Sequence, residues 1–189
     1  HSHITSLANT LGLLKLDKVE NFRQLKEAVA DFAKKRQIPK GEWVIGFGYD
    51  HNHLAEKAHP TRQLLDEACP DHPVLLAHAS GHMGVANSLG LAAMGLSADT
   101  PDPEGGRMGR TEDGSLTGYL EENAFIANSS KAMQPSRESL MKNIEAAQEE
   151  YLRYGITTVQ DGFTKAGEWG LLTQMAKEGR LKVDVVCYA

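Results

Sequence analysis

The stretch Ile156-Thr157-Thr158-Val159-Gln160, followed by Asp161-Gly162, decides the fold class of this chain. Its β-branched residues favour a strand, and Asp-Gly is a frequent way to end one. Residues 136–154 before it have apolar side chains at helical spacing, and a second helical pattern runs through Trp169 to Gly179. Another strand-like run begins near Leu181. This order of helix, strand, helix and strand is typical of parallel βα units and predicts an α/β fold.

Apolar runs and capping residues extend this interpretation toward the N-terminus. Residues 43–49 and 73–79 are apolar runs of strand length, and the second is continuous, as in a strand covered on both faces. Asn21 and Thr61 are predicted to cap helices whose apolar stripes follow them. The remaining predicted elements are a strand over residues 1–6, a short helix within 7–16, a small-residue helix over 84–94, a long loop or lid over 99–114, and a helix that starts at 118.

Composition and charge exclude several classes of protein. The chain has 189 residues, of which 41% are hydrophobic and 24% are charged, as expected for a globular chain. Its net charge of -5, with acids and bases interspersed, argues against a nucleic-acid surface. No apolar run is long enough to span a bilayer. Cys69 and Cys187 lie far apart and outside any CxxC motif, so we expect two reduced core thiols and a cytoplasmic location.

His1-Ser2-His3, at the start of the chain, is the first candidate for metal chemistry. On a strand both imidazoles would point to the same face, because side chains alternate with a period of two. Two imidazoles on one face can bind a divalent cation such as zinc. The pair also fits the remnant of a purification tag, so the residues by themselves leave both interpretations open.

Further polar residues gather where the predicted strands end. The set comprises Asp50, His51, His53, His82 and Asp161. In parallel α/β folds, functional residues collect at the carboxyl ends of strands, so this coincidence suggests a site. Each residue alone has a simpler interpretation. His82 could be a packed loop histidine and Asp161 a turn residue, while His51 and His53 could be exposed or could form a private metal site.

Other titratable residues are interpreted as surface residues. His59 and His72 flank prolines at the edges of predicted helices, and we place both at the surface. Glu122 follows Glu121 in the helix predicted from residue 118, so one of the two carboxylates is expected to face solvent.

Five ordered stretches resemble one known family. They are His1-Ser2-His3; Glu42 to Asp50; His59-Pro60-Thr61-Arg62 with Leu65-Asp66; Pro73-Val74-Leu75-Leu76 with Ser80-Gly81-His82 and Asn87-Ser88; and Gly118 to Ala124 ahead of Gly155 to Gly162. In this order they resemble the metal-dependent amidohydrolase superfamily, and within it the YtcJ-like group called amidohydrolase family 3. The resemblance covers essentially the whole chain.

The resemblance implies a fold and a division of the chain. The fold is α/β: a partial (β/α)8 barrel, strands 1–3, with an α+β insertion between strands 1 and 2. Residues 1–16 would hold the first barrel strand and the segment after it, 17–132 the insertion, and 133–189 the βα units of strands 2 and 3. Because the chain begins and ends within predicted strands, we expect a segment of a longer protein. The exposed strand edges of an opened barrel predict a homodimer or a swapped oligomer.

The resemblance also implies metal chemistry. In the family, one or two divalent metals activate a water that attacks an amide or a related C–N carbon. His1 and His3 match the first two metal ligands of the family, which favours the metal interpretation over the tag, and zinc is the expected ion. The remaining ligands, a lysine or glutamate, two histidines and an aspartate, are expected beyond residue 189. The isolated chain is therefore expected to be inactive.

Substrate contacts are implied within the insertion and after the second barrel strand. The matching residues are Tyr49, Asp50, His82, Asn87, Glu122 and Asp161. His82 comes first among them, since a neutral imidazole can hydrogen-bond a substrate carbonyl. The predicted function is hydrolysis of a non-peptide C–N bond in a small molecule, with no nucleic-acid or membrane partner. The alternative is a substrate-capping or interaction module without a catalytic role of its own.

Overall fold

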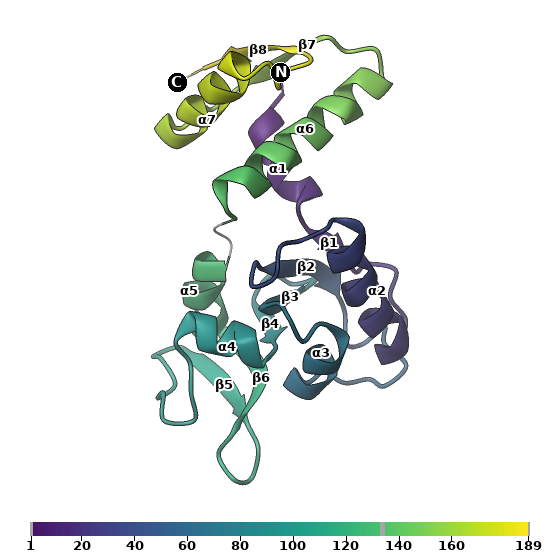
Figure 1. Cartoon of the computed structure of the whole chain (residues 1–189). Helices are drawn as coiled ribbons and strands as arrows, with labels where there is room; N and C mark the ends of the chain where they lie inside the picture. Colours follow the sequence, from purple (N-terminus) through teal and green to yellow (C-terminus); the bar gives the residue numbers. More distant parts are fainter. Residues whose placement is uncertain (1, 133–134, 189) are drawn as a thin grey trace. The chain divides into compact units, whose positions relative to one another are not determined.

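The computed structural model describes residues 2–132 and 135–188, which fold into two compact units (Figure 1). Unit 1 joins the N-terminal residues up to Gly12 to the residues from Pro135 onward, and unit 2 comprises Leu13–Gln134. The short segment after Gly12 therefore belongs to unit 2. The assignment of residues 17–132 to an insertion between two barrel strands stays a prediction.

Unit 2 is built on a six-stranded mixed sheet with the order β1-β2-β3-β4-β6-β5. Its strands are β1 (Leu14–Lys15), β2 (Val44–Tyr49), β3 (Val74–His78), β4 (Met83–Ala86), β5 (Gly106–Arg110) and β6 (Leu116–Glu122). β1, β2 and β3 are parallel, whereas β4 is antiparallel to both β3 and β6, and β5 is antiparallel to β6. The helices are α2 (Phe22–Lys35), α3 (Arg62–Ala68), α4 (Ser88–Met94) and α5 (Asn123–Ala132).

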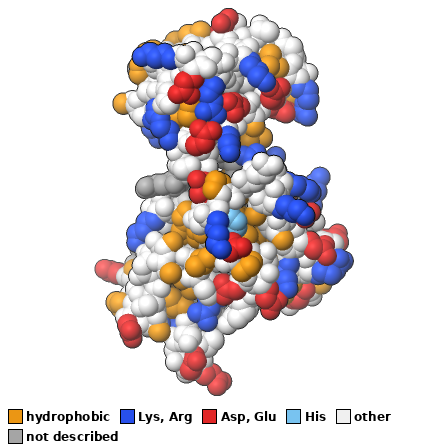
Figure 2. Space-filling model, viewed as in Figure 1, with side chains coloured by type: hydrophobic (Ala, Val, Ile, Leu, Met, Phe, Trp, Pro, Cys, Tyr) orange, Lys and Arg blue, Asp and Glu red, His pale blue; other side chains and the backbone are white. Residues whose placement is uncertain are grey.

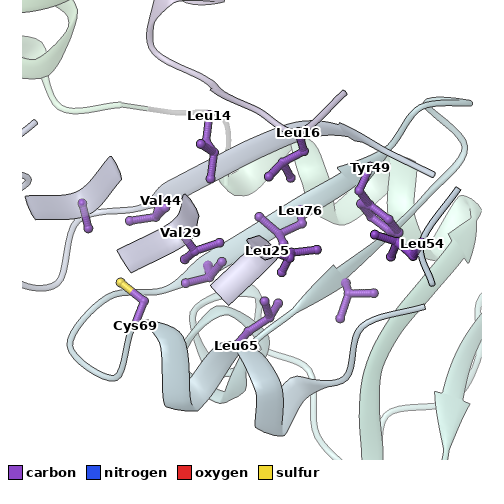
Figure 3. Close-up of a cluster of buried hydrophobic side chains, with 13 residues drawn as sticks. Leu14, Leu16, Leu25, Val29, Val44, Tyr49, Leu54, Leu65, Cys69 and Leu76 are labelled. Carbon is purple, nitrogen blue, oxygen red and sulfur yellow. The ribbon is translucent and has the colours of Figure 1, made fainter. Parts of the chain in front are cut away.

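Two hydrophobic cores cover the two faces of this sheet. Along β3, Val74 and Leu76 enter the first core with α2 and α3, while Leu75 and Ala77 enter the second core with α4 and α5. Figure 3 shows the side chains of the first core. Alternation along a fully buried strand explains why the run 73–79 is continuously apolar. Gly46 of β2 is needed for close packing, because a Cβ there would lie 2.8 Å from a Leu76 methyl carbon.

Unit 1 contains the elements of the final third of the chain. They are α1 (Ile4–Leu11), α6 (Arg137–Arg153), β7 (Thr158–Asp161), α7 (Ala166–Lys177) and β8 (Asp184–Cys187). β7 and β8 pair in parallel and are connected through α7, so the predicted order of helix, strand, helix and strand is confirmed. Their apolar side chains pack with those of α1 and α6 in a third core.

The opening strand predicted over residues 1–6 is wrong within the described residues. Helix α1 starts at Ile4, and His3 forms only an isolated antiparallel bridge with Asp161. Ile4 and Thr5 are β-branched, which favoured a strand, but Ile4 and Ala8 are buried in the third core at helical spacing. Tertiary packing therefore overrides the local preference. The same helix ends at Leu11, so the predicted helix within 7–16 is displaced toward the N-terminus.

Three predictions in the middle of the chain also need correction. The helix predicted over 84–94 starts only at Ser88, because residues 83–86 form β4 between β3 and β6. The loop predicted over 99–114 contains β5. The helix predicted from 118 is instead β6, whose alternating burial is that of a strand, and α5 follows it.

The predicted helix caps are confirmed. The Asn21 side chain accepts a hydrogen bond from Gln24 N at 2.9 Å, and Thr61 Oγ1 accepts one from Leu64 N at 3.4 Å. These short polar side chains satisfy backbone N–H groups that have no partner within the first helical turn.

The surface carries charges of both signs. Figure 2 shows that Lys and Arg side chains are interspersed with Asp and Glu over the face in view. Among the residues that the structure describes, no helix combines the length and the apolar character needed to cross a membrane. Both cysteines are free thiols, Cys69 buried and Cys187 partly buried.

Candidate functional site

One end of the sheet in unit 2 collects four of the six predicted substrate contacts. β2 ends at Tyr49 and the parallel β3 ends at His78. β6 runs in the same direction as β3, because both are antiparallel to β4, and it ends at Glu122, while His82 directly precedes β4. We call this end, with Tyr49, Asp50, His78, His82 and Glu122, the carboxyl edge. The topology thus brings four predicted residues to one edge and adds His78, which the sequence analysis treated only as part of a strand.

A cluster of one carboxylate and two imidazoles lies where β2 and β3 end. His51 Nδ1 is 3.2 Å from His78 Nε2, and Asp50 Oδ1 is 3.5 Å from His78 Nε2 and 3.9 Å from His51 Nδ1. The Asn52 N–H donates to Asp50 Oδ1 at 2.8 Å, a local turn that fixes the carboxylate. In the described part of the chain, Asp50, His51 and His78 are the group of three whose possible ligand atoms all lie within 4.8 Å of one another.

His59 packs against this cluster, although the sequence analysis placed it at the surface. Its ring stacks on that of His51 with centroids 4.2 Å apart, and it lies 4.6 Å from the ring of Tyr119. His59 Nδ1 is 3.0 Å from the hydroxyl of Tyr49, whose side chain is fully buried. The surface prediction for His59 was therefore wrong. The error arises because the loop 50–61 folds back over the carboxyl edge and carries His59 with it. The spacing of apolar residues in the sequence does not reveal this path of the loop.

The surroundings shift the proton affinities in this region. Burial, together with the neighbouring imidazoles, lowers the pKa of His59 to about 4. Burial also lowers the pKa of His78, against the opposing effect of Asp50. The Asn52 N–H holds the pKa of Asp50 below its usual range, and burial raises that of the Tyr49 hydroxyl. At neutral pH, the rings of His59 and His78 are therefore neutral beside an ionised carboxylate.

We expect His59 to titrate far below an ordinary histidine. In the unfolded chain, the neutral ring of His59 gains its second proton near the usual pKa of about 6.5. In the folded chain, it gains this proton only near pH 4. The contribution of the neutral His59 ring to the free energy of unfolding is therefore fully present above about pH 6.5, and it is lost as the pH falls toward 4. The measurement is an NMR titration of the His59 Cε1–H signal, assigned with the His59→Gln variant. A midpoint above pH 6 would contradict the half-buried placement of the ring against the other imidazoles.

The geometry gives His51 a different neighbour from the one in the private His51–His53 metal pair considered as an alternative. The His53 side chain is 80% exposed, and its Nδ1 is 3.6 Å from the other carboxylate oxygen of Asp50. His51 instead faces His78, which is nearly buried and comes from the neighbouring strand. The pairing of β2 with β3 therefore decides which imidazole lies next to His51. The short separation of His51 and His53 in the sequence does not decide this.

His82 and Glu122 form an exposed pair at the carboxyl edge. His82 Nδ1 lies 3.1 Å from Glu122 Oε2, and the two side chains are 60% and 51% exposed. The backbone N–H of Glu122 donates to the carbonyl of His82 at 2.8 Å. Glu122 has φ of 48°, a left-handed conformation that is uncommon for a residue other than glycine. The pair is accessible to a small molecule, and its role in binding stays a prediction.

Asn87 does not fit the predicted substrate contact. Its side chain is 0% exposed and joins β3 to the start of α4. Its Oδ1 accepts from Val74 N and Gly90 N, both at 2.8 Å, and its Nδ2 donates to the carbonyl of His72 at 2.9 Å. The side chain is fully used in capping and bridging, which leaves no surface for a ligand.

In unit 1, Asp161 holds the N-terminal segment. Its side chain is 0% exposed and accepts hydrogen bonds from Thr5 N at 3.2 Å, Thr5 Oγ1 at 2.8 Å and Thr164 Oγ1 at 2.9 Å. The backbone of His3 pairs with that of Asp161, and Ser2 Oγ donates to the carbonyl of Gln160 at 2.7 Å. The described N-terminal residues are therefore attached to β7, as the metal interpretation of this segment requires. His1, the other predicted ligand, lies outside the described residues.

The residues described in unit 1 do not by themselves make a metal site. A zinc site in a protein uses three or four side-chain ligands, and His3 is the one predicted ligand that the described residues supply. The carboxylate of Asp161 is already engaged by two threonine side chains and a backbone N–H.

The chain belongs to the amidohydrolase family, whose model matches residues 1–188. The match supports the branch named in the sequence analysis, amidohydrolase family 3 with YtcJ-like relatives.

Among curated proteins, the chain is 33% identical over 150 residues to the N-substituted formamide deformylase of Arthrobacter pascens, covering 77% of this chain. It is 30% identical over 166 residues to the putative amidohydrolase YtcJ of Bacillus subtilis, covering 86% of this chain. It spans only 28% and 29% of the lengths of these two relatives. The similarity therefore concerns less than a third of each relative.

Solved structures agree with the family assignment. The chain superposes on an uncharacterized metal-dependent hydrolase from Pyrococcus furiosus with a TM-score of 0.73 and 26% sequence identity. The superposition covers 100% of this chain and 36% of that structure. The mixed α/β fold thus corresponds to part of a metal-dependent hydrolase, and no closed barrel is formed by the residues described here.

Proposed function

We propose that this chain is part of an enzyme that hydrolyses a non-peptide C–N bond in a small molecule with the help of a divalent metal, zinc first among the candidates. The observation that carries this proposal is the amidohydrolase family match over residues 1–188. The relative named an N-substituted formamide deformylase supports N-substituted formamides and similar small amides as the substrate class to test first.

We further propose that unit 1 contributes to a (β/α)8 barrel. The parallel β7 and β8, connected through α7, form one such βα unit. Unit 1 also exposes large apolar side chains, namely Tyr154, Ile156, Phe163, Trp169, Val186 and Tyr188. Apolar surface of this kind supports further barrel strands, or a second copy of the chain, as its covering partner.

The proposed roles follow from where the residues lie. His1 and His3 would hold the metal together with ligands from outside this chain, and Asp161 positions the N-terminal segment through Thr5. When bound, such a metal lowers the pKa of a coordinated water toward neutrality and polarises a carbonyl group. His82 and Glu122, both accessible, are the proposed substrate contacts of unit 2.

The test is an assay of formate release from an N-alkylformamide by the full-length enzyme that contains these residues. We expect chelation with EDTA to abolish activity and zinc to restore it. In the His3→Ala variant, kcat/KM should fall about 100-fold or more. Mutating a group that only orients a metal ligand already lowers activity up to about 100-fold, and removing the ligand itself should lower it at least as much. His72→Ala is the matched control, since this half-buried imidazole lies 3.2 Å from the carbonyl of Glu42 and is not one of the proposed ligands or substrate contacts. Equal activity of the two variants would contradict the proposal.

The second candidate function is a non-catalytic role for unit 2. The support for this role is that unit 2 forms a compact unit of its own. The unit has its own sheet and two cores, with the accessible His82 and Glu122 at its edge. The same assay separates the candidates. A unit that only caps the substrate affects KM when its edge is changed, whereas a unit that takes part in the chemistry affects kcat.

A further inference from the structure

The carboxyl edge of unit 2 brings one carboxylate and two imidazoles close enough together to share a cation. Asp50 Oδ1, His51 Nδ1 and His78 Nε2 are separated by 3.2, 3.5 and 3.9 Å. Zinc with ligands at about 2.0–2.1 Å has tetrahedral ligand–ligand distances of about 3.3–3.4 Å. We propose that Asp50, His51 and His78 bind a divalent cation of the zinc type, at a site carried wholly by unit 2.

The identity of the ligands selects the class of ion. Two imidazole nitrogens and one carboxylate suit zinc and its first-row neighbours, whereas magnesium and calcium prefer oxygen ligands. Three protein ligands leave a fourth position for water or another ligand. Asp50 is 25% exposed and His51 is 29% exposed, so the ion can enter from solvent, while His78 closes the inner side.

The fold positions each ligand before any ion arrives. The parallel pairing of β2 and β3 places Tyr49 opposite His78, which brings the loop after Tyr49 to the end of β3. The Asn52 N–H orients the Asp50 carboxylate, and the ring of His59 stacks on that of His51. Rigid ligands lose little conformational freedom on binding, which favours affinity.

Ser80 controls the proton of His78. The Ser80 N–H donates to His78 Nδ1 at 3.0 Å, so the ring proton lies on Nε2, which faces Asp50 and His51. Ligation through Nε2 requires the ring proton to lie on Nδ1, which breaks the hydrogen bond from the Ser80 N–H. Ser80 Oγ, also 3.0 Å from Nδ1, would then accept this proton. The neutral ring keeps one proton throughout, so this step needs no net proton release. Ser80 is thus a positioning residue for the site, in the way that outer groups orient ligating histidines.

The competing interpretation is a hydrogen-bonded network without a cation function. In that case the Nε2–H of His78 bridges Asp50 and His51, and the folded chain has no measurable affinity for zinc at this position. The two interpretations differ in one measurable quantity, the affinity of the folded chain for the metal alone. This quantity does not depend on amidohydrolase activity, so a failure of the proposed function leaves the test intact.

The experiment uses the 189-residue chain with His1→Ala and His3→Ala as background, which removes the N-terminal imidazoles. Zinc binding is measured by calorimetry, and cobalt binding by the visible absorption of the bound ion. We expect one ion per chain in the background. The added substitutions His51→Gln and Asp50→Asn should each weaken binding by more than about tenfold, and Ser80→Ala by about tenfold.

Matched controls use histidines outside the cluster. His53→Gln and His72→Gln should leave the affinity and the cobalt spectrum unchanged. His78→Gln should abolish binding, and thermal unfolding shows whether this nearly buried position still folds. Zinc should raise the unfolding temperature of the background and not that of His51→Gln, as binding to the folded state requires. Absence of zinc binding in a folded background, or loss of binding in His53→Gln, would overturn the proposal.

Discussion

Replacing Asn87 by Ala is expected to lower the free energy of unfolding of unit 2 by about 2–4 kcal/mol. The substitution leaves the buried N–H groups of Val74 and Gly90 and the carbonyl of His72 without their partner. It also removes the cap of α4. Denaturant unfolding followed by the fluorescence of Trp43, in a Trp169→Phe background, measures this effect, because Trp43 packs against the second core of unit 2.

The control for Asn87 is its exposed neighbour. Ser88 Oγ donates to Asp66 at the surface, so Ser88→Ala should cost less than about 1 kcal/mol. A stable Asn87→Ala protein with weakened substrate binding would instead support the substrate contact expected from the sequence.

Replacing Asp161 by Ala is expected to lower the free energy of unfolding of unit 1 by about 2–4 kcal/mol. Two threonine hydroxyls and the N–H of Thr5 then lose their buried acceptor, and the N-terminal segment loses its attachment to β7. Hydrogen exchange at the N–H of Gly162, which donates to the carbonyl of Ser2 at 2.9 Å, reports on this attachment. We expect its protection to fall along with the unfolding free energy.

Asp184 supplies the matched control on the neighbouring strand. Its side chain is exposed on β8, so Asp184→Ala should change stability by no more than about 0.5 kcal/mol. Asp161→Asn should be milder than Asp161→Ala, since an amide oxygen still accepts one or two of the bonds. Equal effects of the Asp161→Ala and Asp184→Ala variants would refute the structural role assigned to Asp161.

The elements predicted correctly depend on local patterns. The β-branched residues around Val159, the apolar stripes of α2 and α6, and the caps at Asn21 and Thr61 are all visible within a few neighbouring residues. The errors occur where distant packing decides. The small residues from Gly84 onward favoured a helix over 84–94, yet residues 83–86 form β4 between two strands. A Cβ at Gly84 would lie 2.5 Å from a ring carbon of Phe125.

The candidate site shows the same limit. Tyr49, Asp50, His82 and Glu122 were predicted because they follow strands or match a family motif, and the topology brings them to one edge. His78 carried no separate signal, since it is one more residue in a buried run. His59 was placed at the surface, because a sequence does not show which way a loop folds.

The sequence by itself determined the family, the α/β class and the helix caps, because these depend on residue types at fixed spacings along the chain. Only the tertiary structure decided that His51 pairs with His78, that Asn87 is a structural cap and that a helix begins directly after His3. The physical reason is that strand register and burial assign each side chain its neighbours, and both arise from contacts between residues far apart in the chain.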